Sequence, residues 1–178
     1  MKRFTHAVVV GGSGMLAGLS RNLLDISEQV TVMARNESRV RAIAPDIEPL
    51  VCDYTNEPAF NAALSSLGQP DLIVAWLHGK LPALRRALAH CLRPKGRFVQ
   101  VLGSAHGDPS HPERLEAMRA AADGLDIAYQ AVVLGFVVEG RTSRWLTDRE
   151  ISQGVFSAVQ SGASLSIVGT VSPWKARP

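Results

Sequence analysis

The stretch from His6 to Gly18 constrains the fold more than any other part of the chain. It begins with an apolar run rich in β-branched residues, places glycines at positions 11, 12 and 14, and continues with leucines at helical spacing. This pattern predicts a strand, a tight turn and a helix. Glycine is required in such a turn where a side chain would block the backbone angles, or where an anion must come close to main-chain N–H groups.

Residues 12–17 fit the dinucleotide-binding fingerprint G-x-G-x-x-G/A, with Ala17 in the last position. The match follows a predicted strand and opens a helix that we expect to start near Ser13. The free N–H groups and positive dipole end of that helix would hold a diphosphate. The alternative is a glycine-rich turn that binds nothing. The residues predicted to contact the dinucleotide here are Gly11, Gly12, Ser13, Gly14, Met15 and Leu16.

The composition is that of an ordinary globular protein and fits one domain covering residues 1–178. Hydrophobic residues make up 46% and charged residues 20% of the chain. We see no signal-peptide pattern and no apolar run long enough to span a membrane, and Cys52 and Cys91 have no metal-type spacing. These features predict a cytoplasmic protein with reduced cysteines and no metal. The net charge of +3 arises from dispersed basic residues, so nucleic-acid binding is not expected.

Short apolar segments alternate with helical patterns along the whole chain, which predicts an α/β fold with a parallel, doubly wound sheet of the Rossmann type. The expected strand order is 3-2-1-4-5-6-7, and the ligand crevice lies outside the carboxyl ends of strands 1 and 4. A capping box at residues 147–150 predicts the start of the last helix. After the strand that begins at His6, strands are expected at residues 29–34, 48–52, 71–76, 96–102, 126–133 and 165–169.

The residue about 20 positions beyond the glycines of a dinucleotide site distinguishes NAD from NADP, because an acid there binds the ribose 2′-hydroxyl and repels a 2′-phosphate. Here Ala34 is followed by Arg35, whose forked guanidinium suits a phosphate. Arg39 lies one helical turn further on. The pattern favours NADP(H) over NAD(H), with Arg35 and Asn36 at the site. Alternatively, Arg35 only ends a strand.

Asp53 and Tyr54 follow the third predicted strand. The carboxylate of Asp53 is placed to accept a hydrogen bond from an adenine amino group, with Tyr54 near the ring. The sequence leaves an equal alternative, in which Asp53 caps the loop that follows.

Taken together, these residues resemble a short-chain dehydrogenase/reductase. Residues 11–17 look like the glycine turn of the extended and atypical branches, and the stretches 143–147 and 173–174 resemble short bacterial proteins of this kind. The resemblance implies that Asp53 contacts adenine, and that the segment after strand 6 covers the nicotinamide. The further cofactor-binding residues implied by position are Ala75, Trp76, Leu77, Gly103, Gly135 and Phe136.

One family feature is missing. Catalysis in the family uses Tyr-x-x-x-Lys, where the lysine lowers the pKa of the phenol and the tyrosine passes a proton. Tyr54 and Tyr129 are the two tyrosines of this chain, and neither is followed by lysine four residues later.

Two functions remain open from the sequence. In the first, an NADPH-dependent reductase, His78 supplies the proton and Ser104 orients the substrate carbonyl, with His106 as a weaker candidate. In the second, the chain is a catalytically silent NADP(H) sensor or interaction module. The substrate pocket is expected to be small or completed by a second copy in a homo-oligomer.

Overall fold

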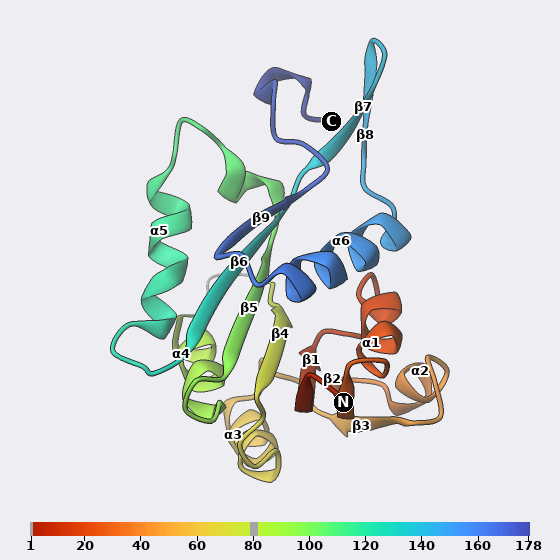
Figure 1. Cartoon of the computed structure of the whole chain (residues 1–178), viewed down its shortest axis with the longest axis vertical. Helices are drawn as coiled ribbons and strands as arrows, with labels where there is room; N and C mark the ends of the chain where they lie inside the picture. The colour runs from red at the N-terminus through yellow and green to blue at the C-terminus, as the bar shows by residue number, and fades with distance from the viewer. Residues whose placement is uncertain (1, 79–81) are drawn as a thin grey trace.

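The computed structural model describes residues 2–78 and 82–178, and its centre is a seven-stranded parallel sheet (Figure 1). The strand order is the one predicted, 3-2-1-4-5-6 followed by the last strand of the chain. In spatial order the strands are β3 (Ile47–Val51), β2 (Ser27–Ala34), β1 (Phe4–Val10), β4 (Leu72–Trp76), β5 (Arg97–Leu102), β6 (Ala128–Leu134) and β9 (Leu165–Val168).

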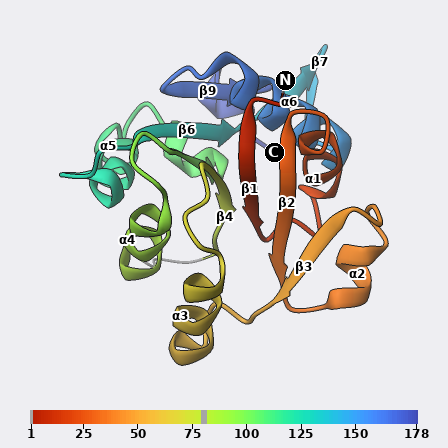
Figure 2. The same ribbon diagram turned by 60° about the horizontal axis from the view of Figure 1, so that its bottom comes forward.

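Alternate side chains of each strand pack under different helices, so both faces of the sheet are covered (Figure 2). One face carries α1 (Ala17–Leu23), α2 (Glu37–Arg41) and α6 (Asp148–Ser161). The opposite face carries α3 (Glu57–Ser66), α4 (Pro82–Cys91) and α5 (Glu113–Arg119). This two-sided burial explains why Val8, Val9 and Val10 are all fully buried although they point alternately up and down.

Short elements complete the chain. The 3-10 turns are η1 (Ser104–Gly107), η2 (Ala120–Ala122) and η3 (Trp174–Ala176). None of the helices in the described ranges is long and apolar enough to span a membrane.

A two-stranded hairpin, β7 (Phe136–Glu139) and β8 (Thr142–Trp145), was not predicted from the sequence. It follows β6 directly and extends beyond the carboxyl edge of the sheet, beside the C-terminal segment (Figure 1). Its strands have only four residues each, and polar residues on both faces hide the alternation that marks a strand. The hairpin explains why the seventh strand of the sheet is β9.

Candidate functional site

The glycine turn lies at the carboxyl end of β1, but the helix after it begins later than predicted. α1 begins at Ala17 rather than near Ser13, and residues 11–16 form a succession of turns. Three glycines and a serine are poor helix formers, so the chain becomes helical only where the alanine and leucine pattern starts. The amides available to an anion are therefore those of the turn itself.

Two of the glycines are required by the packing of the protein. Gly11 has a φ of +77°, and a Cβ there would lie 2.9 Å from the carbonyl oxygen of Trp76 at the end of β4. A Cβ at Gly12 would lie 2.7 Å from a methyl group of Val9 and from the hydroxyl of Ser20. Glycine at these positions lets the turn pack closely against β4 and α1.

At position 14, by contrast, the packing of the protein does not require glycine. Its φ lies outside the left-handed region, and a Cβ added to it would meet no atom within 4 Å. Among the glycines that the structure describes, Gly14 alone combines an ordinary φ with empty space around the missing side chain. The turn therefore presents an open backbone to the outside at the position where the fingerprint expects a diphosphate.

The turn is held in place from both sides. The hydroxyl of Ser20 donates to the carbonyl oxygens of Gly12 and Leu16, at 3.2 and 3.0 Å. Ser152, on α6, donates to the carbonyl of Met15 at 2.8 Å. With the Leu16 side chain fully buried, these bonds fix the turn before any ligand arrives.

A surface pocket of about 400 Å³ between α1 and α2 joins the glycine turn to the basic segment after β2. Ser13 and Arg39 both line it. Arg21 also lines it, but its guanidinium donates to the carbonyl of Ile43. The Arg39 side chain has no hydrogen-bond or ion-pair partner among the described residues, whereas Arg41 on the same helix pairs with Glu37.

Arg35 and Asn36 follow β2, where β2 runs parallel to β3. Asn36 caps α2 by accepting a bond from the Arg39 amide at 3.1 Å. Arg35 is exposed and close enough to Asp53 for its positive charge to help lower the pKa of that carboxyl group. The larger causes of that lowering are the hydrogen bonds from Thr55.

Asp53 caps the loop before α3, as one of the two alternatives predicted. One carboxylate oxygen accepts from the amide and hydroxyl of Thr55, at 3.0 and 2.7 Å. The other oxygen has no partner in the described part of the chain, so the cap does not exclude an adenine contact. Tyr54 is half-buried, and its hydroxyl accepts from the backbone N–H of His78 at 3.3 Å, which links the ends of β3 and β4.

At the end of β4 the side chains differ in their surroundings. Ala75 is fully buried under α3 and α4, and the neighbouring Leu77 is half-buried on the same side. The indole N–H of Trp76 donates to Nε2 of His78 at 3.1 Å. Because indole nitrogen only donates, Nε2 of His78 is the acceptor and the neutral ring carries its proton on Nδ1. A doubly protonated ring would have to give up this bond.

A second pocket, of about 240 Å³, lies outside the carboxyl ends of β4, β5 and β6. It brings together residues predicted separately: Trp76, Gly103, Ser104 and Gly135 all line it, with Trp145, Leu146, Leu134 and Ile151. A Cβ at Gly135 would lie 2.1 Å from the carbonyl of Thr170, so the close approach of the C-terminal segment requires this glycine.

Phe136 is placed differently from its neighbours. Its side chain is fully buried, and its backbone N–H and C=O both pair with Thr170. His106 does not line the pocket either: its Nδ1 lies 3.3 Å from the carbonyl of Gly103, and burial lowers the pKa of the ring. The pocket wall is therefore built from Gly135 and Ser104 at this end.

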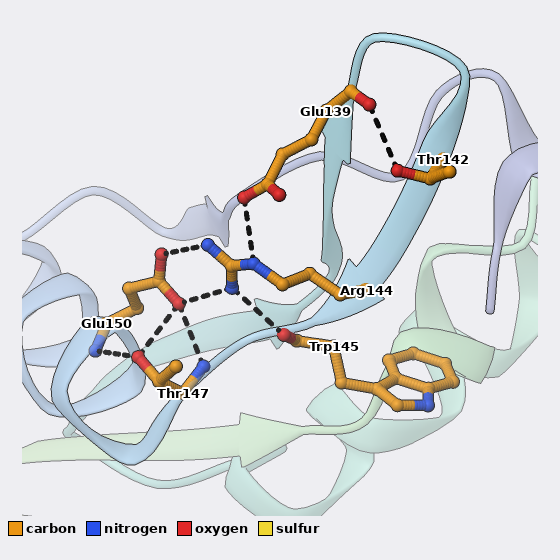
Figure 3. Close-up of polar contacts among 6 residues, drawn as sticks. All are labelled: Glu139, Thr142, Arg144, Trp145, Thr147 and Glu150. Atoms are coloured by element: carbon orange, nitrogen blue, oxygen red, sulfur yellow. Dashed lines mark hydrogen bonds and ion pairs between the residues drawn. The ribbon is translucent and has the colours of Figure 1, made fainter.

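The hairpin is fixed to α6 by an ion-pair network that the sequence did not reveal (Figure 3). Arg144 makes two bonds to Glu150, at 2.9 and 3.1 Å, and one to Glu139 at 2.8 Å. Glu150 also accepts from the amide and hydroxyl of Thr147, both at 2.8 Å, which completes the predicted capping box. The network holds Trp145 over the pocket.

The capping glutamate should make stability depend on acid pH. Hydrogen bonds from Arg144 and Thr147 lower the pKa of Glu150 to about 2. Because the folded pKa is below the unfolded one, the stabilisation is complete above about pH 4.5 and is lost as pH falls towards 2. Glu150→Gln should unfold at lower temperature than the parent at pH 7, and the gap should narrow below about pH 4.5 and close only towards pH 2. Glu37→Gln, which removes the acid of the exposed Glu37–Arg41 pair on α2, is the matched control. A difference in unfolding temperature between Glu150→Gln and the parent that does not change with pH would contradict the prediction.

The second tyrosine lies away from the pocket. Tyr129 donates to Gln100 at 2.9 Å beneath α5, and burial raises its pKa. Its hydroxyl is therefore an internal hydrogen-bond donor rather than a proton carrier. Sequence reasoning also missed Arg177, which donates to the Ser104 hydroxyl at 2.9 Å.

No protein-family model matches the chain, and no curated protein matches its sequence. Solved structures do match. A short-chain dehydrogenase from Burkholderia cenocepacia in complex with NADP shares 20% identity at a TM-score of 0.69, over 99% of this chain and 93% of that one. A metagenomic short-chain oxidoreductase in complex with NADP shares 18% at 0.60, over 93% and 96%. A bulky-bulky ketone specific alcohol dehydrogenase from Comamonas testosteroni shares 13% at 0.70, over 98% and 90%.

The parallel sheet, the glycine turn after its first strand and the pocket outside the strand ends define a Rossmann-type α/β protein. Over nearly its whole length, the chain has the fold of the short-chain dehydrogenase/reductases.

Proposed function

We propose that the protein binds NADP(H) and reduces a small carbonyl compound. The binding part of the proposal depends on Gly14, because neither the backbone angles nor the packing of the protein requires glycine at that position. The NADP complexes of two structural neighbours support the choice of ligand. The fold alone would not, because the same fold carries many activities.

The residues present suit the proposed cofactor. The backbone amides of residues 12–14 would hold the diphosphate, and Arg35 and Arg39 would pair with the 2′-phosphate of the adenosine. The carboxylate oxygen of Asp53 that has no partner among the described residues would accept from the adenine amino group. Trp76 and Gly103 would flank the nicotinamide end, with Gly135 opposite, whereas Leu77 packs on the side of α3 and α4. When bound, NADPH supplies a hydride.

Ser104 and His78 are the residues that we assign to the reaction. The Ser104 oxygen already accepts from Arg177, so its own proton is available to a substrate carbonyl oxygen in the pocket. Carbonyl reduction also consumes one proton, which we assign to His78; its ring does not line the pocket in the described structure but is bonded to Trp76, which does. The ring must release Trp76 to take up that proton, and its exposed position allows it to do so.

A silent NADP(H)-binding module is the second candidate. The buried, internally bonded hydroxyl of Tyr129 and the engagement of the His78 ring by Trp76 favour it, because neither group is poised to deliver a proton. Such a protein would keep the glycine turn and the basic pocket but would need no proton donor.

Calorimetric titration with NADPH and NADH tests the binding proposal. We expect NADPH to bind at least about tenfold more tightly, since a charged phosphate–guanidinium bond contributes roughly 1.5–3 kcal/mol. The absence of heat with both dinucleotides would remove the proposal.

Turnover separates the two candidates. Steady NADPH oxidation with some member of a panel of aldehydes, ketones and enones is the result that the reductase predicts. Tight NADPH binding without turnover on the whole panel would favour the silent module.

We propose a cytoplasmic, single-domain protein that acts on small molecules rather than on nucleic acid. Both cysteines are free, and Cys52 is buried. The small pocket beside the exposed Trp145 is consistent with a homo-oligomer in which a second copy extends it.

A further inference from the structure

The segment after β9 folds back across the end of the sheet and reaches the second pocket. Thr170 pairs with Phe136 through two backbone bonds of 2.9 Å, and the turn η3 follows (Figure 1). Arg177 then donates from Nε to the Ser104 hydroxyl at 2.9 Å. Two distant parts of the chain thus meet at a residue that lines the pocket.

The guanidinium of Arg177 is held by aromatic rings rather than by an acid. Its central carbon lies 5.1 Å from the ring centroid of Trp145 and 5.4 Å from that of Trp174. Within residues 2–78 and 82–178 it forms no ion pair, and its two terminal amino groups have no hydrogen-bond partner. The acids of the neighbouring hairpin region, Glu139 and Glu150, are both engaged by Arg144.

The two indole rings position the guanidinium, so a ligand that binds it has to immobilise less side-chain motion. Arg177 is itself exposed, but its contacts with two indole rings restrict its rotamers before an anion binds, which lowers the entropic cost of binding. The two terminal amino groups, which have no hydrogen-bond partner in the described ranges, present parallel N–H donors in a planar fork that matches the two oxygens of a carboxylate.

The pocket beside the guanidinium is small and mostly apolar. Its volume of about 240 Å³ is below the roughly 300–1,000 Å³ of common ligand sites. Leu134, Leu146 and Ile151 form its aliphatic wall, and Trp76 and Trp145 add indole rings. Ser104 contributes a hydroxyl whose oxygen accepts from Arg177 and whose proton has no acceptor among the described residues.

We propose that this pocket binds a compact, apolar carboxylic acid, with the carboxylate paired to Arg177 and the body between Trp145 and the aliphatic wall. Binding of the acid does not depend on the proposed reductase function. If the pocket is the substrate site of that reductase, which rests on the proposed function, the substrate class becomes the small apolar oxo acids, with the oxo group at the Ser104 hydroxyl.

Benzoate and benzyl alcohol test the proposal, because they share an apolar body and differ in charge. Titration of the full chain without cofactor at pH 7, followed by tryptophan fluorescence and calorimetry, should show benzoate binding at least about tenfold more tightly. Arg177→Gln should abolish the difference between the two compounds, and Arg177→Lys should retain part of it. Arg141→Gln, an exposed arginine in the hairpin turn, should keep the parental affinities.

The outcomes separate this inference from the proposed function. Equal affinity for the two compounds, no benzoate binding up to about 10 mM, or parental benzoate affinity in a folded Arg177→Gln variant would each overturn the carboxylate site. Thermal unfolding of Arg177→Gln shows whether the variant is folded. A protein that binds NADPH but not benzoate loses this inference alone, and one that binds benzoate but neither dinucleotide loses the proposed function alone.

Discussion

Replacing Gly14 by valine should weaken NADPH binding at least about 100-fold, which corresponds to roughly 2.7 kcal/mol. The fold leaves empty space at this glycine, so the new side chain meets no protein atom near its Cβ. In the proposed complex that same space is occupied by the diphosphate, and the valine would keep its oxygens away from the turn amides. Calorimetric titration of parent and variant measures the loss.

The thermal unfolding midpoint of Gly14→Val should stay within about 2 °C of the parent, because nothing in the fold is displaced. Gly12→Val is the contrasting variant. Its Cβ would lie 2.7 Å from Val9 and Ser20, so it should be destabilised by about 1–3 kcal/mol before any ligand is added. Unchanged NADPH affinity in a folded Gly14→Val protein would show that the open turn binds something else or nothing.

The sheet could be predicted from the sequence because its signals are local and repeated. Each parallel strand is buried on both faces and therefore shows as an apolar run, as in residues 72–75. Right-handed connections that do not cross leave only a few possible strand orders. The capping box at Thr147 was visible for the same reason, since its two partners are three residues apart. The ends of elements are set by packing as well as by local sequence, and α1 begins about one turn later than the glycine pattern suggested.

The second pocket could be predicted only in part. Trp76, Gly103, Ser104 and Gly135 were placed at strand ends, and the parallel topology brings strand ends together. Arg177 could not be found, because the contact with Ser104 spans 73 positions and depends on a path set by Thr170 and Phe136. The hairpin network of Arg144 likewise involves charged residues whose partners no short pattern identifies.

Replacing Arg35 by aspartate should reverse the preference between NADPH and NADH. The substitution removes a cation from the proposed 2′-phosphate site and adds an acid that can bind the free 2′-hydroxyl of NADH. The affinity for NADPH therefore falls and the affinity for NADH rises. We expect NADPH to lose about 100-fold or more and NADH to gain a few-fold, as measured by titration of both dinucleotides.

Two variants on α2 sharpen this test. Arg39→Gln removes the guanidinium that has no partner in the described structure and faces the pocket beside Ser13, so it should cost NADPH about tenfold and leave NADH unchanged. Arg41→Gln is the matched control, since it removes the same charge from the same helix but from a side chain already paired with Glu37. If Arg41→Gln lowers NADPH affinity as much as Arg39→Gln does, the effect comes from general charge and the phosphate site is placed wrongly.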